Sequence, residues 1–273
     1  MQKLPQLLKK TNIVIIGTGN LATHLTHFIS HHADLNLVQL FNHRKTKEAT
    51  LLAKQSNCDL VSKYNEIITN ADIYIICVND DSIKVVAKNL IPLKIKNLVV
   101  HSSGSIDLLA LTNASQQIGV FYPLQTFSKN DSIDWKSTPV LLEANTKLAF
   151  SKLKVFSSLF SSVIKNVNSE KRLSIHLAAV FGCNFTNALY AVSYQILENA
   201  FRKSEAKLLN PILQQSFNKM LNIGPVSAQT GPAKRNDKIT IQKHIALLKT
   251  NKQLSSIYKS LSELIKTQQH VKF

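Results

Sequence analysis

Apolar and polar positions divide the chain into two parts of different character. In the first part, short continuous apolar runs alternate with segments of helical spacing. The runs predict strands at residues 13–17, 37–41, 71–78, 97–103, 118–123 and 139–144, with a last one at 162–167. The helical spacing predicts helices at residues 22–32, 47–55, 81–90 and 146–160. Strands that are apolar throughout are buried on both faces, so we expect an α/β fold with a doubly wound, mostly parallel sheet.

After residue 168 the chain has no comparable strand pattern and is predicted to be all helical. Residues 170–200 contain one glycine and no proline, and predict one helix about 45 Å long. Further helices are predicted at residues 204–221, 239–249 and 253–267, with a loop at 222–237. We therefore expect a Rossmann domain at 1–168 and a helical substrate and dimerisation domain at 169–273. The long helix is apolar nearly all round, which favours a homodimer through this half.

The net charge of +17 is unevenly distributed, with +3 in residues 1–145 and +14 in residues 146–273. A basic half is compatible with nucleic acid, an anionic membrane or a small anionic ligand. The lysines are scattered singly and only four of the basic residues are arginine. We interpret the charge as a solvated surface and expect no nucleic-acid partner.

Cysteine content and hydropathy indicate the cellular compartment in which the protein works. The three cysteines are far apart with no CxxC pair, so we expect neither a disulfide framework nor a metal site, in a reducing compartment. Residues 1–12 are basic and lack the long apolar segment of a signal peptide. The most apolar later stretch contains His176, Asn184, Thr186 and Asn187, which is too polar for an ordinary membrane span. We expect a cytoplasmic protein with no membrane partner.

A glycine loop stands between the first strand and the first helix. Its sequence is Gly17-Thr18-Gly19-Asn20-Leu21-Ala22, which matches GxGxxA. The first glycine permits the tight turn, and Gly19 lets the backbone approach a pyrophosphate at the helix N-terminus. An ordinary glycine turn is the alternative, but the strand before the loop and the helix after it favour dinucleotide binding.

The end of the second strand bears on which dinucleotide binds. NAD enzymes usually place Asp or Glu there to bind the ribose hydroxyls. Here Asn42-His43-Arg44-Lys45 follows the strand, and Arg44 with Lys45 could hold a 2′-phosphate. This favours NADP over NAD, with a solvated helix start as the alternative.

Polar residues also follow three later strands. They are Val78-Asn79-Asp80, His101-Ser102-Ser103-Gly104-Ser105 and Tyr122-Pro123-Leu124-Gln125-Thr126. Ligands of open parallel sheets bind beyond the carboxyl ends of the strands. We expect Val78 and Asn79 to contact the cofactor, Ser102 to act in catalysis, and Ser103 and Gln125 to bind substrate. Capping of a helix that begins near Ile106 is the alternative role for the serines.

The helical half offers two polar sites. His176 and Asn184 are eight residues apart in an apolar helix, so they share a face and need polar partners. We expect His176 to exchange a proton near neutral pH and Asn184 to orient the reacting group; a structural role for the histidine is the alternative. In the loop Gln229–Asp237, Asp237 suits a helix cap, whereas Thr230 and Arg235 are candidates to bind an anionic substrate.

The segments IGTGNLATHL, VVHSSGS, FYPLQTF, HLAAVFGCNFTNALY and QTGPAKRND together resemble a bacterial family of uncharacterised Rossmann-like oxidoreductases. That family is similar to pyrroline-5-carboxylate reductase, 6-phosphogluconate dehydrogenase and NADP-dependent deazaflavin reductases. The resemblance spans nearly the whole chain. It implies an N-terminal NAD(P) domain and a helical C-terminal domain of the 6-phosphogluconate dehydrogenase type, which commonly dimerises.

One departure affects the chemistry that the resemblance implies. The better-known dehydrogenases carry a lysine on the first long helix and an asparagine about one turn later. Here His176 occupies roughly that region, Val180 follows one turn later, and the asparagine is Asn184. We expect an NADP-dependent oxidoreductase that transfers hydride to or from a small anionic carbonyl or imine. The alternative is a dinucleotide-binding or sensing protein without catalysis.

Overall fold

The computed structural model describes residues 10–201 and 207–268. The chain forms two compact units that divide between Asn187 and Ala188. This division lies inside the long helix. The boundary expected at residue 168, where that helix begins, stays a prediction. Residues 1–9, where we expected no signal segment, and the helix start expected at Ser204 lie outside the described residues.

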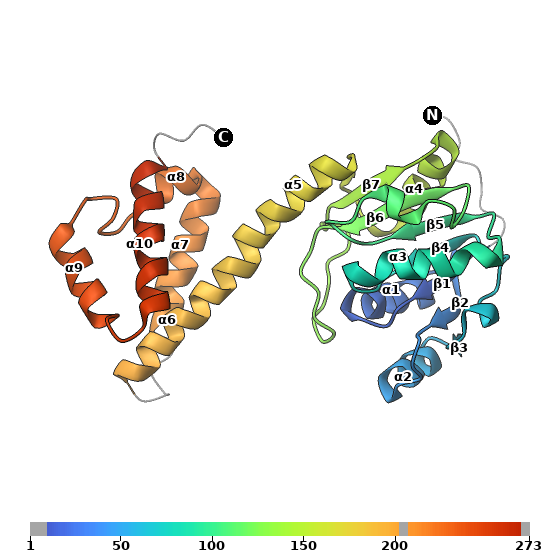
Figure 1. Cartoon of the computed structure of the whole chain (residues 1–273), viewed down its shortest axis with the longest axis horizontal. Coiled ribbons are helices and arrows are strands. Elements are labelled where there is room, and N and C mark those ends of the chain that lie inside the picture. The colour runs from blue at the N-terminus through green and yellow to red at the C-terminus, as the bar shows by residue number, and fades with distance from the viewer. Residues whose placement is uncertain (1–9, 202–206, 269–273) are drawn as a thin grey trace. The chain divides into compact units, whose positions relative to one another are not determined.

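Within the described residues, an eight-stranded sheet forms the centre of the first unit (Figure 1). Its strands are β1 (Thr11–Ile16), β2 (Leu35–Phe41), β3 (Asp59–Val61), β4 (Ile73–Ile76), β5 (Leu98–His101), β6 (Ile118–Pro123), β7 (Val140–Ala144) and β8 (Ile164–Asn166). Their order is β3-β2-β1-β4-β5-β6-β7-β8, and all neighbours are parallel except β6 and β7. The expected mostly parallel, doubly wound sheet is confirmed. The chain reverses direction across the sheet between β1 and β4, where open sheets of this type bind ligands.

Helices cover both faces of this sheet. On one face lie α1 (Asn20–Ser30), α2 (Lys47–Gln55) and α4 (Lys147–Phe160), and on the other lies α3 (Asp80–Leu90). Each face of the sheet has its own hydrophobic core, and successive residues of β1 alternate between them. Ile13 and Ile15 pack in the core under α1, α2 and α4, whereas Val14 and Ile16 pack in the core under α3. All four are fully buried, which explains why the strand is apolar throughout.

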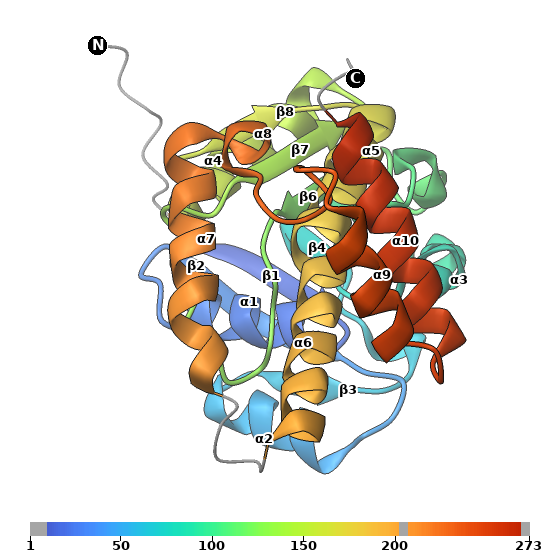
Figure 2. The same cartoon turned by 90° about the vertical axis from the view of Figure 1, so that its left-hand side faces the viewer.

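The described elements after residue 168 are helical, as expected. They are α5 (Ser169–Ala179), a π-helical segment (Val180–Phe185), α6 (Thr186–Ala200), α7 (Asn210–Ile223), α8 (Pro225–Ala228), α9 (Lys238–Leu247) and α10 (Lys252–Thr267). Figure 2 shows α7, α9 and α10 of the second unit in orange and red. Three of these helices begin with a side-chain cap, in which Asn168, Asp237 and Asn251 accept a backbone N–H of the first turn.

Among the described residues, the helix Ser169–Ala200 is long and apolar enough to cross a membrane by length and composition alone. The core helix of a soluble protein passes the same test. The polar residues His176 and Asn184 in its middle remain our reason to expect that it does not span a membrane.

The structure differs from the sequence predictions in a few elements. The short strand β3 was not expected, and its residues are half-buried or exposed. The helix expected near Ile106 is instead a 3-10 turn at Leu108–Leu111, which Asp107 caps. The loop expected at 222–237 contains the short helix α8, and the long helix includes a π-helical segment.

Candidate functional site

The glycine loop lies between β1 and α1, beside the point where the chain reverses direction across the sheet. Gly17 has a φ of +114°, and a Cβ atom there would lie 2.1 Å from the Cys77 carbonyl oxygen. A Cβ on Gly19 would meet nothing within 4 Å. In the described chain, no side chain caps the N-terminus of α1. The open space at Gly19 and the uncapped first-turn N–H groups fit a pyrophosphate.

The other loop residues expected to bind cofactor surround these glycines. Thr18 is half-buried, and Leu21 packs against the core under α1. The Asn20 side-chain amide donates a 2.8 Å hydrogen bond to the Phe127 carbonyl. This contact joins the glycine loop to the segment that follows β6.

The ends of β2 and β4 border the same loop. Asn42 donates to the Arg44 carbonyl at 2.7 Å, which shapes the turn before α2 and leaves the Arg44 side chain exposed. A Cβ on Gly17 would lie 3.2 Å from a methyl group of Val78, and Asn79 follows it at the start of α3 without a capping bond. Val78 therefore lies beside Gly17, and contact of Val78 and Asn79 with the cofactor stays a prediction.

The serine loop, residues 102–105 after β5, is held by hydrogen bonds within the loop and to Asp80 and Ile76. Ser103 accepts the backbone N–H groups of Ser105 and Ile106 at 3.1 and 3.0 Å, which closes a turn within the loop, whereas Asp107 caps the 3-10 turn that follows. Ser105 donates to the Asp80 carboxylate at 2.5 Å, and Ser102 donates to the Ile76 carbonyl at 3.2 Å. A substrate role for Ser103 stays a prediction, and it requires the hydroxyl to share these bonds.

His176 packs directly on this loop. Its Nδ1 shares a 2.9 Å hydrogen bond with the Tyr122 hydroxyl at the end of β6, and the two rings meet edge to face at 5.9 Å. A Cβ on Gly104 would lie 2.7 Å from the His176 ring and 2.8 Å from Tyr122, so only glycine permits this approach. Burial raises the pKa of Tyr122, so its hydroxyl keeps its proton at neutral pH. Because Nδ1 is bonded to Tyr122, Nε2 is the ring nitrogen of His176 that remains for another partner, and proton exchange there stays a prediction.

Asn184 lies on the same helix, in the π-helical segment. In a regular α-helix, eight residues make about 2.2 turns, which would leave Asn184 about a fifth of a turn out of line with His176. A π turn bonds residue i to i+5 and takes more residues per turn, so it reduces that offset. The Asn184 side chain is exposed. Whether it orients a substrate stays a prediction.

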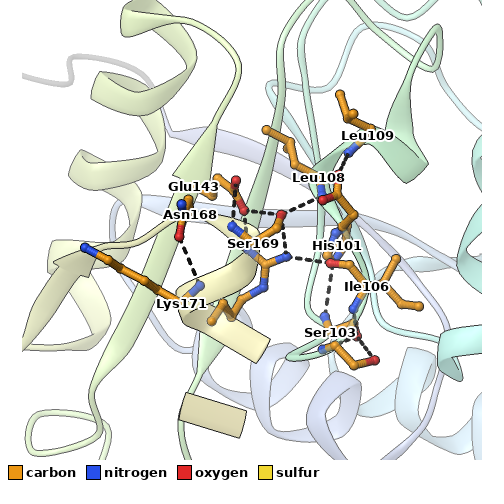
Figure 3. Close-up of polar contacts among 12 residues, drawn as sticks. His101, Ser103, Ile106, Leu108, Leu109, Glu143, Asn168, Ser169 and Lys171 are labelled. Carbon is orange, nitrogen blue, oxygen red and sulfur yellow. Dashed lines mark hydrogen bonds and ion pairs between the residues drawn. The ribbon is translucent and has the colours of Figure 1, made fainter. Parts of the chain in front are cut away.

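A buried ion pair fixes the start of this helix to the sheet (Figure 3). Arg172 is 1% exposed and pairs with Glu143 of β7. Its guanidinium also donates to the Ile106 carbonyl and, at 3.2 Å, to the Ser169 hydroxyl. Ser169 in turn donates to Glu143 at 2.8 Å and accepts the Leu108 N–H at 3.1 Å. These contacts join α5, β7 and the loop after β5.

Arg172 is one helical turn before His176, so the ion pair also fixes the position of His176 relative to Gly104. This pair was not predicted from the sequence. A signal was present, because Arg172 lies on a largely apolar helix and Glu143 ends an apolar strand. Neither residue shows which partner the other takes, since they are 29 positions apart.

His101 lies beneath the same loop, at the end of β5. It is fully buried, and its Nδ1 accepts the Ser103 N–H at 3.2 Å. Burial lowers its pKa to about 4, with the nearby charge of Arg172 acting in the same direction and the Asp107 backbone opposing it. His101 is therefore neutral at physiological pH and packs beneath the site as part of its framework.

The remaining predicted residues are exposed. Gln125 accepts the N–H of its neighbour Thr126 and presents its side chain to solvent. In the second unit, Thr230 and Arg235 are exposed on the loop before α9. Asp237 accepts the Thr240 N–H at 3.0 Å, which is the capping role expected for it. The structure thus brings His176 together with the serine loop and Tyr122 in the first unit, whereas Thr230 and Arg235 are exposed on one loop of the second unit.

Family comparisons agree with this geometry. Residues 11–100 match an oxidoreductase family with an NAD-binding Rossmann fold, and residues 138–265 match a domain of unknown function, DUF2520. No curated protein matches the chain in sequence.

Three solved structures show how far the likeness extends. A "putative NADP oxidoreductase" from Bacteroides fragilis is 32% identical over 94% of this chain and 98% of its own, with a TM-score of 0.86. A pyrroline-5-carboxylate reductase from Coxiella burnetii is 16% identical over 95% of this chain and 97% of its own, with a TM-score of 0.56. An imine reductase from Myxococcus stipitatus, in complex with NADP+, is 14% identical over 94% and 92%, with a TM-score of 0.62. The last two share the fold.

Proposed function

The chain belongs to the family of Rossmann-type NAD(P)-dependent oxidoreductases that includes the Bacteroides fragilis protein, and from that premise we propose that it transfers hydride between NADP(H) and a small carbonyl or imine substrate. One observation carries the proposal. His176 is held by Tyr122 and Gly104 at the carboxyl edge of a sheet whose first loop fits a dinucleotide pyrophosphate. This combination joins a hydride carrier to a proton donor at the sheet edge where ligands bind.

The roles divide between cofactor and protein. The nicotinamide supplies the hydride when it is bound. His176 exchanges the accompanying proton at Nε2, because Nδ1 is held by Tyr122. The Tyr122 hydroxyl can donate to a neutral ring and accept from a protonated one, so it holds His176 in both states. Ser102 and Asn184 are proposed to orient the reacting group. In the second unit, Arg235 and Thr230 are proposed to bind an anion.

NADPH oxidation across a panel of keto acids and cyclic imines tests this function. We expect turnover with at least one class, and a loss of about 10²- to 10⁴-fold in His176→Ala, the range typical of general acid–base catalysis. His244→Ala is the matched control, because His244 makes the same 2.9 Å bond to a tyrosine, Tyr258, in the second unit. Tight NADPH binding without turnover on any substrate would instead favour the dinucleotide-sensing alternative.

We also propose NADP as the preferred cofactor. Arg44 and Lys45 are exposed at the end of β2, where NAD enzymes usually carry an acid. The imine reductase with the same fold is in complex with NADP+. Titration calorimetry should show tighter binding of NADPH than of NADH, and Arg44→Ala should abolish the difference. Equal affinities in the unmutated protein would contradict this preference.

A homodimer is the proposed assembly. Leu177, Phe181 and Phe185 are 55%, 59% and 50% exposed on the long helix, although each is a large apolar side chain. An apolar surface of this kind is typical of an oligomer interface. Light scattering at micromolar concentration should report twice the 30.5 kDa mass of the chain. We propose a cytoplasmic location, where NADPH and reduced cysteines are compatible.

A further inference from the structure

The serine loop is anchored at both ends on the segment that joins β4 to α3. At its start, the N–H and the hydroxyl of Ser102 both donate to the Ile76 carbonyl, at 3.2 Å each. At its end, the Ser105 hydroxyl donates to Oδ2 of Asp80 at 2.5 Å. Asp80 is the first residue of α3, and among the hydrogen bonds of the described residues this is the one that ties the loop to that helix. The loop therefore rests on the chain between the end of one strand and the start of one helix.

Gly104, between these two anchors, lies against the hydrogen bond that joins His176 to Tyr122. A Cβ atom on Gly104 would lie 2.7 Å from Nδ1 of His176, the atom that bonds to the Tyr122 hydroxyl, and 2.8 Å from the tyrosine ring. Gly104 is buried, so its backbone fills the space beside both rings. A shift of the loop would leave a gap there or push the rings apart. The position of the two rings therefore depends on how the loop is held.

Two neighbouring aspartates, Asp80 and Asp81, lie in the first turn of α3. Acidic groups at a helix start interact favourably with the helix dipole, which would account for either residue. Their contacts differ, because Asp80 accepts a short, charge-assisted bond from Ser105, whereas Asp81 forms no ion pair within the described residues. The pKa of the Tyr122 hydroxyl is raised mainly by burial and also by the charge of Asp80, which agrees with a carboxylate close to this site. The helix dipole therefore explains Asp81 but leaves the bond from Asp80 to the loop unexplained.

We infer that Asp80 is a positioning residue, which acts through Ser105 to hold the serine loop against His176. The inference rests on the proposed role of His176 as the group that exchanges the proton. Asp80 follows Val78 by two residues, and Val78 lies beside Gly17 of the glycine loop. The same short segment therefore borders the cofactor loop and carries the anchor of the proton donor. Misplacing a reacting group by about 1 Å can cost on the order of 10²-fold in rate, so one hydrogen bond at this point can have a large effect.

Nitrogen-15 NMR of the imidazole rings in the full chain reports the hydrogen bond of His176 without any substrate. Tyr122→Phe removes the hydroxyl and so gives the reference position of the Nδ1 resonance when that bond is lost. In Asp80→Ala we expect the His176 resonance to move most of the way toward this reference. Asp80→Asn keeps a side-chain oxygen that can accept from Ser105, so its resonance should stay near the unmutated position. Asp81→Ala is the matched control, because it removes an equal charge from the same helix turn, and it should leave the resonance unchanged.

Turnover gives a second readout once the panel of keto acids and cyclic imines has yielded a substrate. Asp80→Ala should lower kcat at least about tenfold and change KM less than about twofold, because a displaced proton donor affects the transition state more than substrate binding. Asp80→Asn should retain kcat within about threefold of the unmutated value, since it keeps the acceptor. Ser105→Ala removes the same bond from its other side, so the double variant with Asp80→Ala should lose no more than either single variant.

The outcomes separate the inference from its premise. If Asp80→Ala leaves the His176 resonance unchanged, the bond to Ser105 does not hold the ring and the inference is wrong. If Asp81→Ala moves the resonance as far as Asp80→Ala does, the charge at the helix start acts instead, and the inference is also wrong. Losses of kcat that add in the double variant would likewise contradict it, because the two residues would then act independently. If no substrate is turned over, the proposed function fails, while the resonance still decides whether Asp80 positions His176.

Discussion

Replacing Arg172 by methionine should destabilise the protein far more than a surface change, because the guanidinium is almost completely buried. The substitution would leave the Glu143 carboxylate, which is 16% exposed, without its cation. It would also leave the Ile106 carbonyl without its guanidinium donor. Neither group can recover a full hydration shell at that depth.

The size of the effect follows from these unpaired groups. Breaking one partner of a buried ion pair typically costs about 3–5 kcal/mol. Glu143 keeps two bonds from Ser169, at 3.0 and 2.8 Å, which favours the lower part of that range. For a unit of this size, a loss of about 3 kcal/mol lowers the melting temperature by roughly 10 °C.

Urea unfolding and calorimetry measure this loss directly. Lys171→Met is the matched control, since Lys171 is exposed on the same helix turn and should change stability by less than about 0.5 kcal/mol. The double variant Arg172→Met with Glu143→Met should recover much of the loss, because it removes both charges together. A single variant within about 1 kcal/mol of the unmutated protein would refute the reasoning, as would a double variant less stable than Arg172→Met alone.

Three further perturbations address the rest of the site. The folded pKa of His101 is about 4 and its unfolded value is 6.5, so the neutral ring contributes about 3 kcal/mol to the free energy of unfolding above pH 6.5. This contribution is lost as pH falls toward 4, and His101→Asn should flatten the resulting dependence of the urea midpoint on pH. Gly19→Val should abolish dinucleotide binding in calorimetry and leave the circular dichroism spectrum unchanged, so retained affinity would show that the loop is not the site. Gly104→Ala should displace His176 and lower turnover at least tenfold once a substrate is found, whereas Gly182→Ala, whose Cβ meets nothing within 4 Å, should not.

Much of the fold could be predicted because its elements carry strong local patterns. Strands such as β1 are buried on both faces and are apolar throughout, and α2 was predicted at the residues where it occurs. Strand β3 escaped prediction because it has three residues and none is fully buried. The π-helical segment was missed because the apolar pattern of a helix does not reveal the local change from i+4 to i+5 bonding.

The candidate site was predictable only where one short segment carries the whole requirement. The glycine loop is such a segment, since the turn at Gly17 and the open backbone at Gly19 follow from adjacent residues. The pairs that position His176 are different, because Tyr122 and Arg172 find their partners 54 and 29 positions away. A polar residue in an apolar element signals that a partner must exist, since burial without one is costly. It does not identify the partner, because that depends on which strand ends and loops the sheet order brings together. The proton transfer proposed for this site therefore depends on how β6, β7 and α5 come together in space, whereas its cofactor binding depends on one short segment of sequence.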